Sequence, residues 1–147
     1  DGGACAIGIE STIVNLIGRP SILRLGGLDT LKIQKALGFN INISINPKKK
    51  IAPGQSRLHY SPGIPLRMNV TKPKNDEAFI IIKRKKTKLK NYFYLTSKNN
   101  LDKAAKNLYS CLRKIKNEGY KSIAVEKIPN IGLGKAINDR LQRASKY

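Results

Sequence analysis

The feature that most constrains the fold is a proline- and glycine-rich stretch near the middle of the chain, Ala52–Pro65, which reads APGQSRLHYSPGIP. Proline fixes φ and lacks a backbone donor, so this stretch cannot form a helix interior or a central strand. Its two Pro-Gly dipeptides are typical of turns. We therefore predict a connector between two folded segments. Two interpretations stay open, a plain tether or a loop that closes over a ligand, because its centre carries His59 and Tyr60.

The length and the cysteine usage set further bounds. A chain of 147 residues forms one domain or two small ones. It begins Asp1-Gly2-Gly3, without methionine or a signal-peptide pattern, so we expect a fragment of a longer protein. Cys5 and Cys111 are far apart and the chain has a single histidine, which argues against a zinc site or any other protein-held metal. Two thiols without a pairing pattern favour a reducing cytoplasm, and no apolar run is long enough to cross a membrane.

The net charge is +20, from 29 Lys and Arg against 9 Asp and Glu. Such an excess favours anionic partners, namely phosphates, nucleotides, RNA or an acidic protein. The alternative is a solvated surface, because the chain is also rich in Ile and Asn, which share AT-rich codons with Lys. High charge with a mean hydropathy of −0.37 also predicts marginal stability in isolation.

The first segment predicts two strands that carry polar groups. Ala4–Asn15 reads as a strand with a polar centre that includes Ser11 and Thr12, whose hydroxyls suit a small amino acid or a phosphate. An edge strand with a wet face explains the same pattern. Ser21–Leu25 reads as an apolar strand with Arg24 inside it, and an arginine there needs a carboxylate or a phosphate.

Hydrophobic spacing predicts the remaining elements and an α/β fold. The predicted helices are Leu28–Leu37, Leu101–Lys116 and Gly134–Ser145. The other predicted strands are Ile41–Ile45, Leu66–Val70, Ala78–Lys83, Asn91–Leu95 and Lys121–Glu126. The run from Tyr92 to Val125 predicts a right-handed βαβ unit.

Some local features of the second segment are also predicted. Lys83–Lys90, KRKKTKLK, is expected to be a solvated hairpin or loop, with an RNA contact as the alternative. Ser97 or Asn99 is expected to cap the long helix, and Asp139, Arg140 and Arg143 to lie around the polar side of the last one.

Four blocks in this order resemble a known family: DGGACAIGIESTIVN, SILRLGGLD, PGQSRLHYSPGIPLRMN and AAKNLYSCLRKIKNEGYKSIAVEKIPNIGLGKAINDRLQRAS. Together they closely resemble the C-terminal portion of the two-domain threonylcarbamoyl-AMP synthases, the YrdC-like enzymes with an added small domain. The resemblance implies a remnant of the YrdC-like catalytic domain over residues 1–46, a linker over 47–64, and a small Rossmann-like α/β domain with a βαβ unit over 65–147.

The resemblance also implies an activity and its residues. In that family, ATP, L-threonine and bicarbonate, with Mg²⁺ accompanying ATP, yield threonylcarbamoyl-AMP and pyrophosphate, and the product serves tRNA modification by downstream machinery. It implies that Ser11 binds threonine, that Arg24 and Tyr60 bind ATP, and that Thr12 and His59 support them. The linker is expected to close over the nucleotide, with its far end anchored on the small domain.

One departure from the family concerns the N-terminal side. The family's N-terminal sequence, with its Lys-x-Arg nucleotide contacts and its Ser-x-Asn motif, is absent here, so the fragment alone is expected to be inactive. A basic RNA-binding α/β module without catalysis, in which Tyr60 stacks on a base, is the alternative function, and a scaffold without a ligand is the third hypothesis.

Overall fold

The computed structural model describes residues 7–45, 51–55, 60–85 and 89–145. The expectations for His59 and Cys5, and part of those for the lysine-rich run, lie outside these residues. The fold is α/β, as the sequence predicts.

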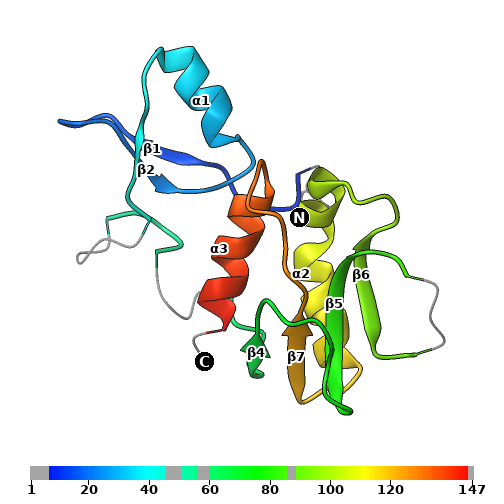
Figure 1. The fold of residues 1–147 in the computed structure, drawn as a ribbon. Coiled ribbons are helices and arrows are strands. Elements are labelled where there is room, and N and C mark those ends of the chain that lie inside the picture. Colours follow the sequence, from blue (N-terminus) through cyan, green and yellow to red (C-terminus); the bar gives the residue numbers. More distant parts are fainter. Residues whose placement is uncertain (1–6, 46–50, 56–59, 86–88, 146–147) are drawn as a thin grey trace.

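The first segment forms a small three-stranded sheet with one helix (Figure 1). Its strands are β1 (Ile13–Asn15), β2 (Ser21–Arg24) and β3 (Asn42–Ile43), in the order β1-β2-β3. β1 pairs antiparallel with β2, and β2 pairs parallel with β3. Helix α1 (Thr30–Leu37) connects β2 to β3. The Asp29 carboxylate accepts a hydrogen bond from the Leu31 amide at the start of α1, and Gly38 ends the helix at a φ of 75°.

The predicted strand over Ala4–Asn15 is wrong for the described residues before Ile13. Residues 7–12 follow an irregular path, and the strand is only three residues long. Gly8 has a φ of 77°, which is incompatible with a strand. The Glu10 carbonyl accepts from the Gly27 amide instead of a ladder partner. Ser11 and Thr12 therefore lie on a loop beside the end of β2.

The second segment forms a fully parallel four-stranded sheet. Its strands are β4 (Leu66–Arg67), β5 (Glu77–Lys83), β6 (Tyr92–Thr96) and β7 (Ser122–Val125), in the order β4-β7-β5-β6. Helices α2 (Leu101–Asn117) and α3 (Gly134–Ala144) pack on the face that carries Ile80 and Ile123 (Figure 1). The opposite face holds a smaller apolar cluster around Phe79.

The pairing refines two predictions. The β6–α2–β7 crossover is present, but β5 lies between β6 and β7, so the unit spans a strand rather than joining neighbours. The lysine-rich segment joins β5 to β6, which are parallel, so a hairpin is excluded there. The expected cap of α2 is also wrong: Asn100, rather than Ser97 or Asn99, accepts from the Lys103 amide.

Two arginines of α3 are buried, which corrects the prediction that they lie on its polar side. Arg140 and Arg143 are only 1% and 5% exposed. Asp139 pairs with both guanidinium groups, and Glu10 pairs with Arg140, so their charges are compensated inside the protein.

The two segments share one apolar core. A single buried cluster contains Ile22 and Leu25 of the first segment together with Ile137 and Leu141 of α3. The division at the linker stays a prediction, but the two parts are packed against each other through α3.

Candidate functional site

Three of the predicted site residues, Ser11, Arg24 and Tyr60, meet where the 7–12 loop, the end of β2 and the linker converge. Two glycines after β2 allow this approach. A methyl group on Gly26 would lie 2.3 Å from the backbone of both Ser11 and Thr12, and the Gly27 amide donates to the Glu10 carbonyl at 2.9 Å. Only glycine fits so close a backbone contact. The Gly-Gly pair thus holds the loop against the end of β2.

Arg24 is held against Ser11 by two hydrogen bonds. Its Nε donates to the Ser11 carbonyl at 3.0 Å, and Nη2 donates to the Ser11 hydroxyl oxygen at 3.2 Å. Nη1 lies 3.4 Å from the carbonyl of Pro53 in the linker. Within the described ranges, no carboxylate lies at ion-pair distance from Arg24. Its positive charge is therefore oriented by neutral acceptors and is suited to an anionic ligand.

Tyr60 borders the same place from the linker. A methyl group on Gly54 would lie 2.7 Å from the Tyr60 hydroxyl and 3.1 Å from Cδ of Arg24, so both side chains flank this glycine. Tyr60 has a φ of 137°, a value that residues with side chains rarely adopt. Its ring stacks on Tyr109 of α2, with 5.7 Å between centroids and 22° between planes. The guanidinium of Arg140 lies 5.2 Å from the centre of the Tyr60 ring.

Glu10, directly before Ser11, is the acidic centre of the site. Arg140 donates to one Glu10 carboxylate oxygen from Nη2 at 2.8 Å and from Nε at 3.2 Å. The Tyr109 hydroxyl lies 3.3 Å from each of the two Glu10 carboxylate oxygens. Burial raises the pKa of Glu10, but the hydrogen bond and charge of Arg140, together with a backbone hydrogen bond and one from Tyr60, outweigh burial, so the pKa is below its ordinary value. Burial, and then the charge of Glu10, raise the pKa of Tyr109, so its hydroxyl stays a donor.

Of the two residues predicted to support the site, Thr12 and His59, the structure describes only Thr12. The Thr12 hydroxyl donates to the Leu28 carbonyl at 2.8 Å and accepts from the Leu28 amide at 3.2 Å. Any support that Thr12 gives to Ser11 therefore passes through the backbone. His59 lies outside the described residues.

The structure adds residues that the sequence predictions missed. The amide of Gln55, a residue only 5% exposed, accepts from the backbone amides of Ile51 and Ala52 and donates to the Leu23 carbonyl at 3.0 Å. Arg143 donates to the Gln55 carbonyl at 3.1 Å and to the Ile45 carbonyl at 2.8 Å. At the far end of the linker, the Ile123 amide donates to the Pro65 carbonyl. The linker is thus joined at one end to β2 and α3, and at the other to β7.

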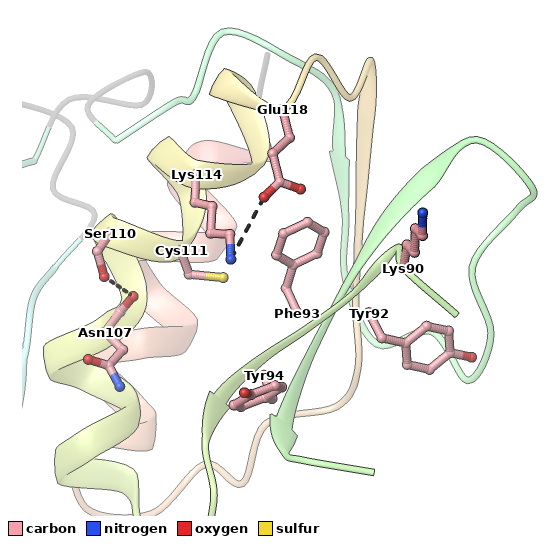
Figure 2. Close-up of a pocket in the computed structure, with 9 residues that line it drawn as sticks. All are labelled: Lys90, Tyr92, Phe93, Tyr94, Asn107, Ser110, Cys111, Lys114 and Glu118. Carbon is pink, nitrogen blue, oxygen red and sulfur yellow. Dashed lines mark hydrogen bonds and ion pairs between the residues drawn. The ribbon is translucent and has the colours of Figure 1, made fainter. Parts of the chain in front are cut away.

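A separate hollow of about 350 Å³ lies between β6 and α2 (Figure 2). Some of its polar groups pair with one another: Lys114 lies 3.7 Å from Glu118, and Ser110 donates to the Asn107 carbonyl. Burial raises the pKa of the Cys111 thiol to about 12, so it is not a nucleophilic thiolate. None of the predicted site residues that the structure describes lines this hollow, and we do not assign the site to it.

The described residues offer neither a metal site nor a membrane-spanning helix. No three His, Cys, Asp or Glu side chains among them are grouped so that they could hold a metal ion. No helix in this part of the chain has the length and apolar character that a membrane span requires.

The comparisons with known proteins decide the family. The protein-family model Sua5_C, described as the C-terminal domain of threonylcarbamoyl-AMP synthase, matches residues 27–146. The chain belongs to this family. Curated synthases from Pyrococcus abyssi and Bacillus subtilis are 31% and 28% identical over 100% and 99% of the chain. The chain spans about half the length of these relatives, 48% and 47% respectively.

Solved structures of the family share the fold. The crystal structure of P. abyssi Sua5 complexed with L-threonine matches the whole chain with a TM-score of 0.81 at 29% identity, over 48% of its own length. A P. abyssi Sua5 variant in which an adjacent His-Tyr pair is replaced by alanines matches with a TM-score of 0.77 at 26% identity, over 97% of this chain and 46% of that one. These matches confirm the predicted relation to the C-terminal part of the synthases.

Proposed function

We propose that the chain is the C-terminal part of an L-threonylcarbamoyladenylate synthase, which forms threonylcarbamoyl-AMP and pyrophosphate from ATP, L-threonine and bicarbonate. The observation that carries the proposal is Arg24, oriented by Ser11 and Pro53 with no carboxylate partner among the described residues, beside Tyr60. A guanidinium held in this way is suited to phosphate oxygens.

The proposed roles follow from the contacts. The Ser11 hydroxyl accepts from Arg24, so its own proton is left to donate to a ligand oxygen, which suits the carboxylate or hydroxyl of threonine. The relative crystallised with L-threonine supports this substrate. We assign Arg24 to phosphate oxygens of ATP and Tyr60 to a nucleotide contact, and His59 stays a supporting residue in the proposal.

The chemistry explains why such a site needs both charge and cover. The amine of threonine and bicarbonate form a carbamate with loss of water. A carbamate oxygen then attacks the α-phosphorus of ATP, an O–P bond forms, and pyrophosphate leaves. Arg24 would compensate charge on the phosphates, and Mg²⁺ would accompany ATP. The mixed anhydride hydrolyses easily, so a linker that covers the site would protect it.

The rest of the enzyme is part of the proposal. Because the chain spans about half of its relatives, we expect activity only together with the remaining part of the catalytic domain. We place the enzyme in the cytoplasm, where its labile product would pass to the machinery that modifies tRNA.

The test uses the full-length protein that contains this chain. Pyrophosphate release should require ATP, L-threonine and bicarbonate together. Arg24→Ala should raise the KM for ATP about tenfold to a hundredfold, because a charge-assisted contact is lost. Arg19→Ala, which removes an exposed arginine from the turn before β2, is the matched control and should leave the KM unchanged. Unchanged ATP kinetics in Arg24→Ala, with reduced stability, would assign Arg24 a structural role instead.

RNA binding by the small domain is a second candidate function. Residues 65–147 hold 21 of the 29 basic and 6 of the 9 acidic residues, a net charge of +15. On the β6 side of the sheet, the Arg84 guanidinium lies 5.1 Å from the centre of the Tyr94 ring, and Tyr94 is 46% exposed. Such a pair can stack on a base. Binding of a tRNA transcript should then weaken steeply with salt and weaken further in Tyr94→Ala, whereas an effect of salt alone would indicate unspecific attraction.

A further inference from the structure

The proposed substrate residues depend on a helix that does not itself carry them. Arg140 lies on α3, and its side chain is fully buried. Its guanidinium reaches Glu10 at 2.8 Å, and Ser11 follows Glu10 directly in the chain. The same guanidinium lies 5.2 Å from the centre of the Tyr60 ring. One side chain therefore contacts both the loop that carries Ser11 and the linker residue Tyr60.

The positions of Glu10 and Tyr60 depend on side-chain contacts in addition to the Gly27 and Arg24 hydrogen bonds to the 7–12 loop. Residues 7–12 form no ladder hydrogen bonds, so regular structure does not fix where Ser11 lies. Tyr60 has a φ of 137°, which its own backbone does not favour, so packing must hold it there. Arg140 forms an ion pair with Glu10 in the 7–12 loop and a cation–π contact with the Tyr60 ring.

Arg140 is itself held in place. The Asp139 carboxylate accepts from its Nη1 at 2.9 Å, and Tyr109, on which the Tyr60 ring stacks, lies 3.3 Å from the same Glu10 oxygens. The donors of a guanidinium have a fixed planar geometry, so a guanidinium anchored at Asp139 also sets the orientation of Glu10.

We propose that Arg140 is a positioning residue of the synthase site, through which α3 of the small domain orients Ser11 and Tyr60 by way of Glu10 and the tyrosine ring. This inference rests on the proposed function for its kinetic consequences. The dependence of the 7–12 loop on the Glu10–Arg140 ion pair is a property of the fold, and it is measurable without any substrate.

The kinetic experiment uses the full-length protein and four variants: Arg140→Met, Arg140→Lys, Glu10→Gln and the Glu10→Gln/Arg140→Met double variant. Arg140→Met should raise the KM for threonine and ATP about tenfold with a smaller fall in kcat, because the residues remain but are no longer oriented. Arg140→Lys keeps a charge near Glu10 and should restore part of the loss. The double variant should be no worse than the more affected single variant. Additive effects would overturn the proposal.

A second measurement separates this proposal from the proposed function. Hydrogen exchange of the full-length protein without substrates should increase in Arg140→Met for residues 7–12 and for the linker around Tyr60. Arg143→Met is the matched control, since Arg143 is equally buried and pairs with the same Asp139 but contacts neither Glu10 nor Tyr60. It should increase exchange near Ile45 and Gln55, whose carbonyls Arg143 holds, and leave residues 7–12 protected.

The outcomes are distinguishable. If the wild-type protein releases no pyrophosphate but the exchange pattern holds, the proposed function fails and the positioning role of Arg140 stands. If exchange at residues 7–12 is unchanged in Arg140→Met, or rises equally in Arg143→Met, then Arg140 is a structural residue of α3 and the positioning role is wrong.

Discussion

Neutralising Asp139 should destabilise the protein strongly, because one carboxylate serves two buried arginines. Asp139 is 7% exposed at its side chain, and Arg140 and Arg143 are 0% and 6% exposed. With Glu10 these groups form a neutral set of two positive and two negative charges. Asp139→Asn keeps the shape but leaves one buried positive charge in excess. Removing one partner of a buried pair costs about 3–5 kcal/mol.

The lower end of that range applies here. An asparagine oxygen can still accept one hydrogen bond, and Glu10 still compensates Arg140. We therefore expect a loss of about 3 kcal/mol, which moves the urea midpoint of unfolding by about 1.5 M at a slope of about 2 kcal/mol/M. Unfolding of the chain would be followed by far-UV circular dichroism, with the slope checked for constancy.

The matched control is Asp76→Asn, which makes the same chemical change at an exposed carboxylate. Both variants raise the net charge by one, so the difference between them isolates the buried pairs. Asp76→Asn should change the free energy of unfolding by less than about 0.5 kcal/mol. The loss in Asp139→Asn should persist in high salt, which screens exposed charges much more than buried ones. A loss below about 1 kcal/mol, or one equal to that of the control, would refute the reasoning.

Three further predictions concern the linker and the acid response. Gly54→Ala and Gly119→Ala both place alanine at a φ of 83° and should each cost about 1–2 kcal/mol, but only Gly54→Ala meets Tyr60 and should raise the KM for ATP of the full-length protein. Gln55→Ala leaves the amides of Ile51 and Ala52 without their acceptor, so their hydrogen exchange should accelerate while that of α2 stays unchanged. The hydrogen bond from Arg67 lowers the pKa of Glu77 in the folded protein. The Glu77 carboxylate therefore adds stability above its unfolded-state pKa of about 4.5, and this stability is lost as the pH falls below that value. Between pH 6 and pH 3 the free energy of unfolding should fall less in Glu77→Gln than in the wild type, and an equal fall would contradict the assignment.

Local patterns predicted most of the fold. The apolar stripe of α2 and the short apolar run of β7 follow from residue spacing. The order of strands was not predictable in the same way, because the position of β5 between β6 and β7 depends on pairings between residues far apart in the sequence.

The candidate site was predicted in part, since Ser11 and Arg24 stood out as polar residues in apolar surroundings and the structure brings them together. Arg140 was missed because charge was given more weight than spacing. It lies four residues from both Ala136 and Ala144, on the buried stripe of α3, and this period was visible in the sequence. Its partner Glu10 was not visible, because nothing local connects two residues that are 130 positions apart.

That separation has a consequence for how the protein is made. Glu10 leaves the ribosome 130 residues before Arg140, a delay on the order of 10 s at about 5–20 residues per second. The loop that carries Ser11 cannot be fixed by its ion pair until α3 has been synthesised and packed. A chain that ends before α3 through premature termination would lack the partner of Glu10 even though every residue of the loop is present. The ion pair that fixes this loop thus depends on synthesis of α3.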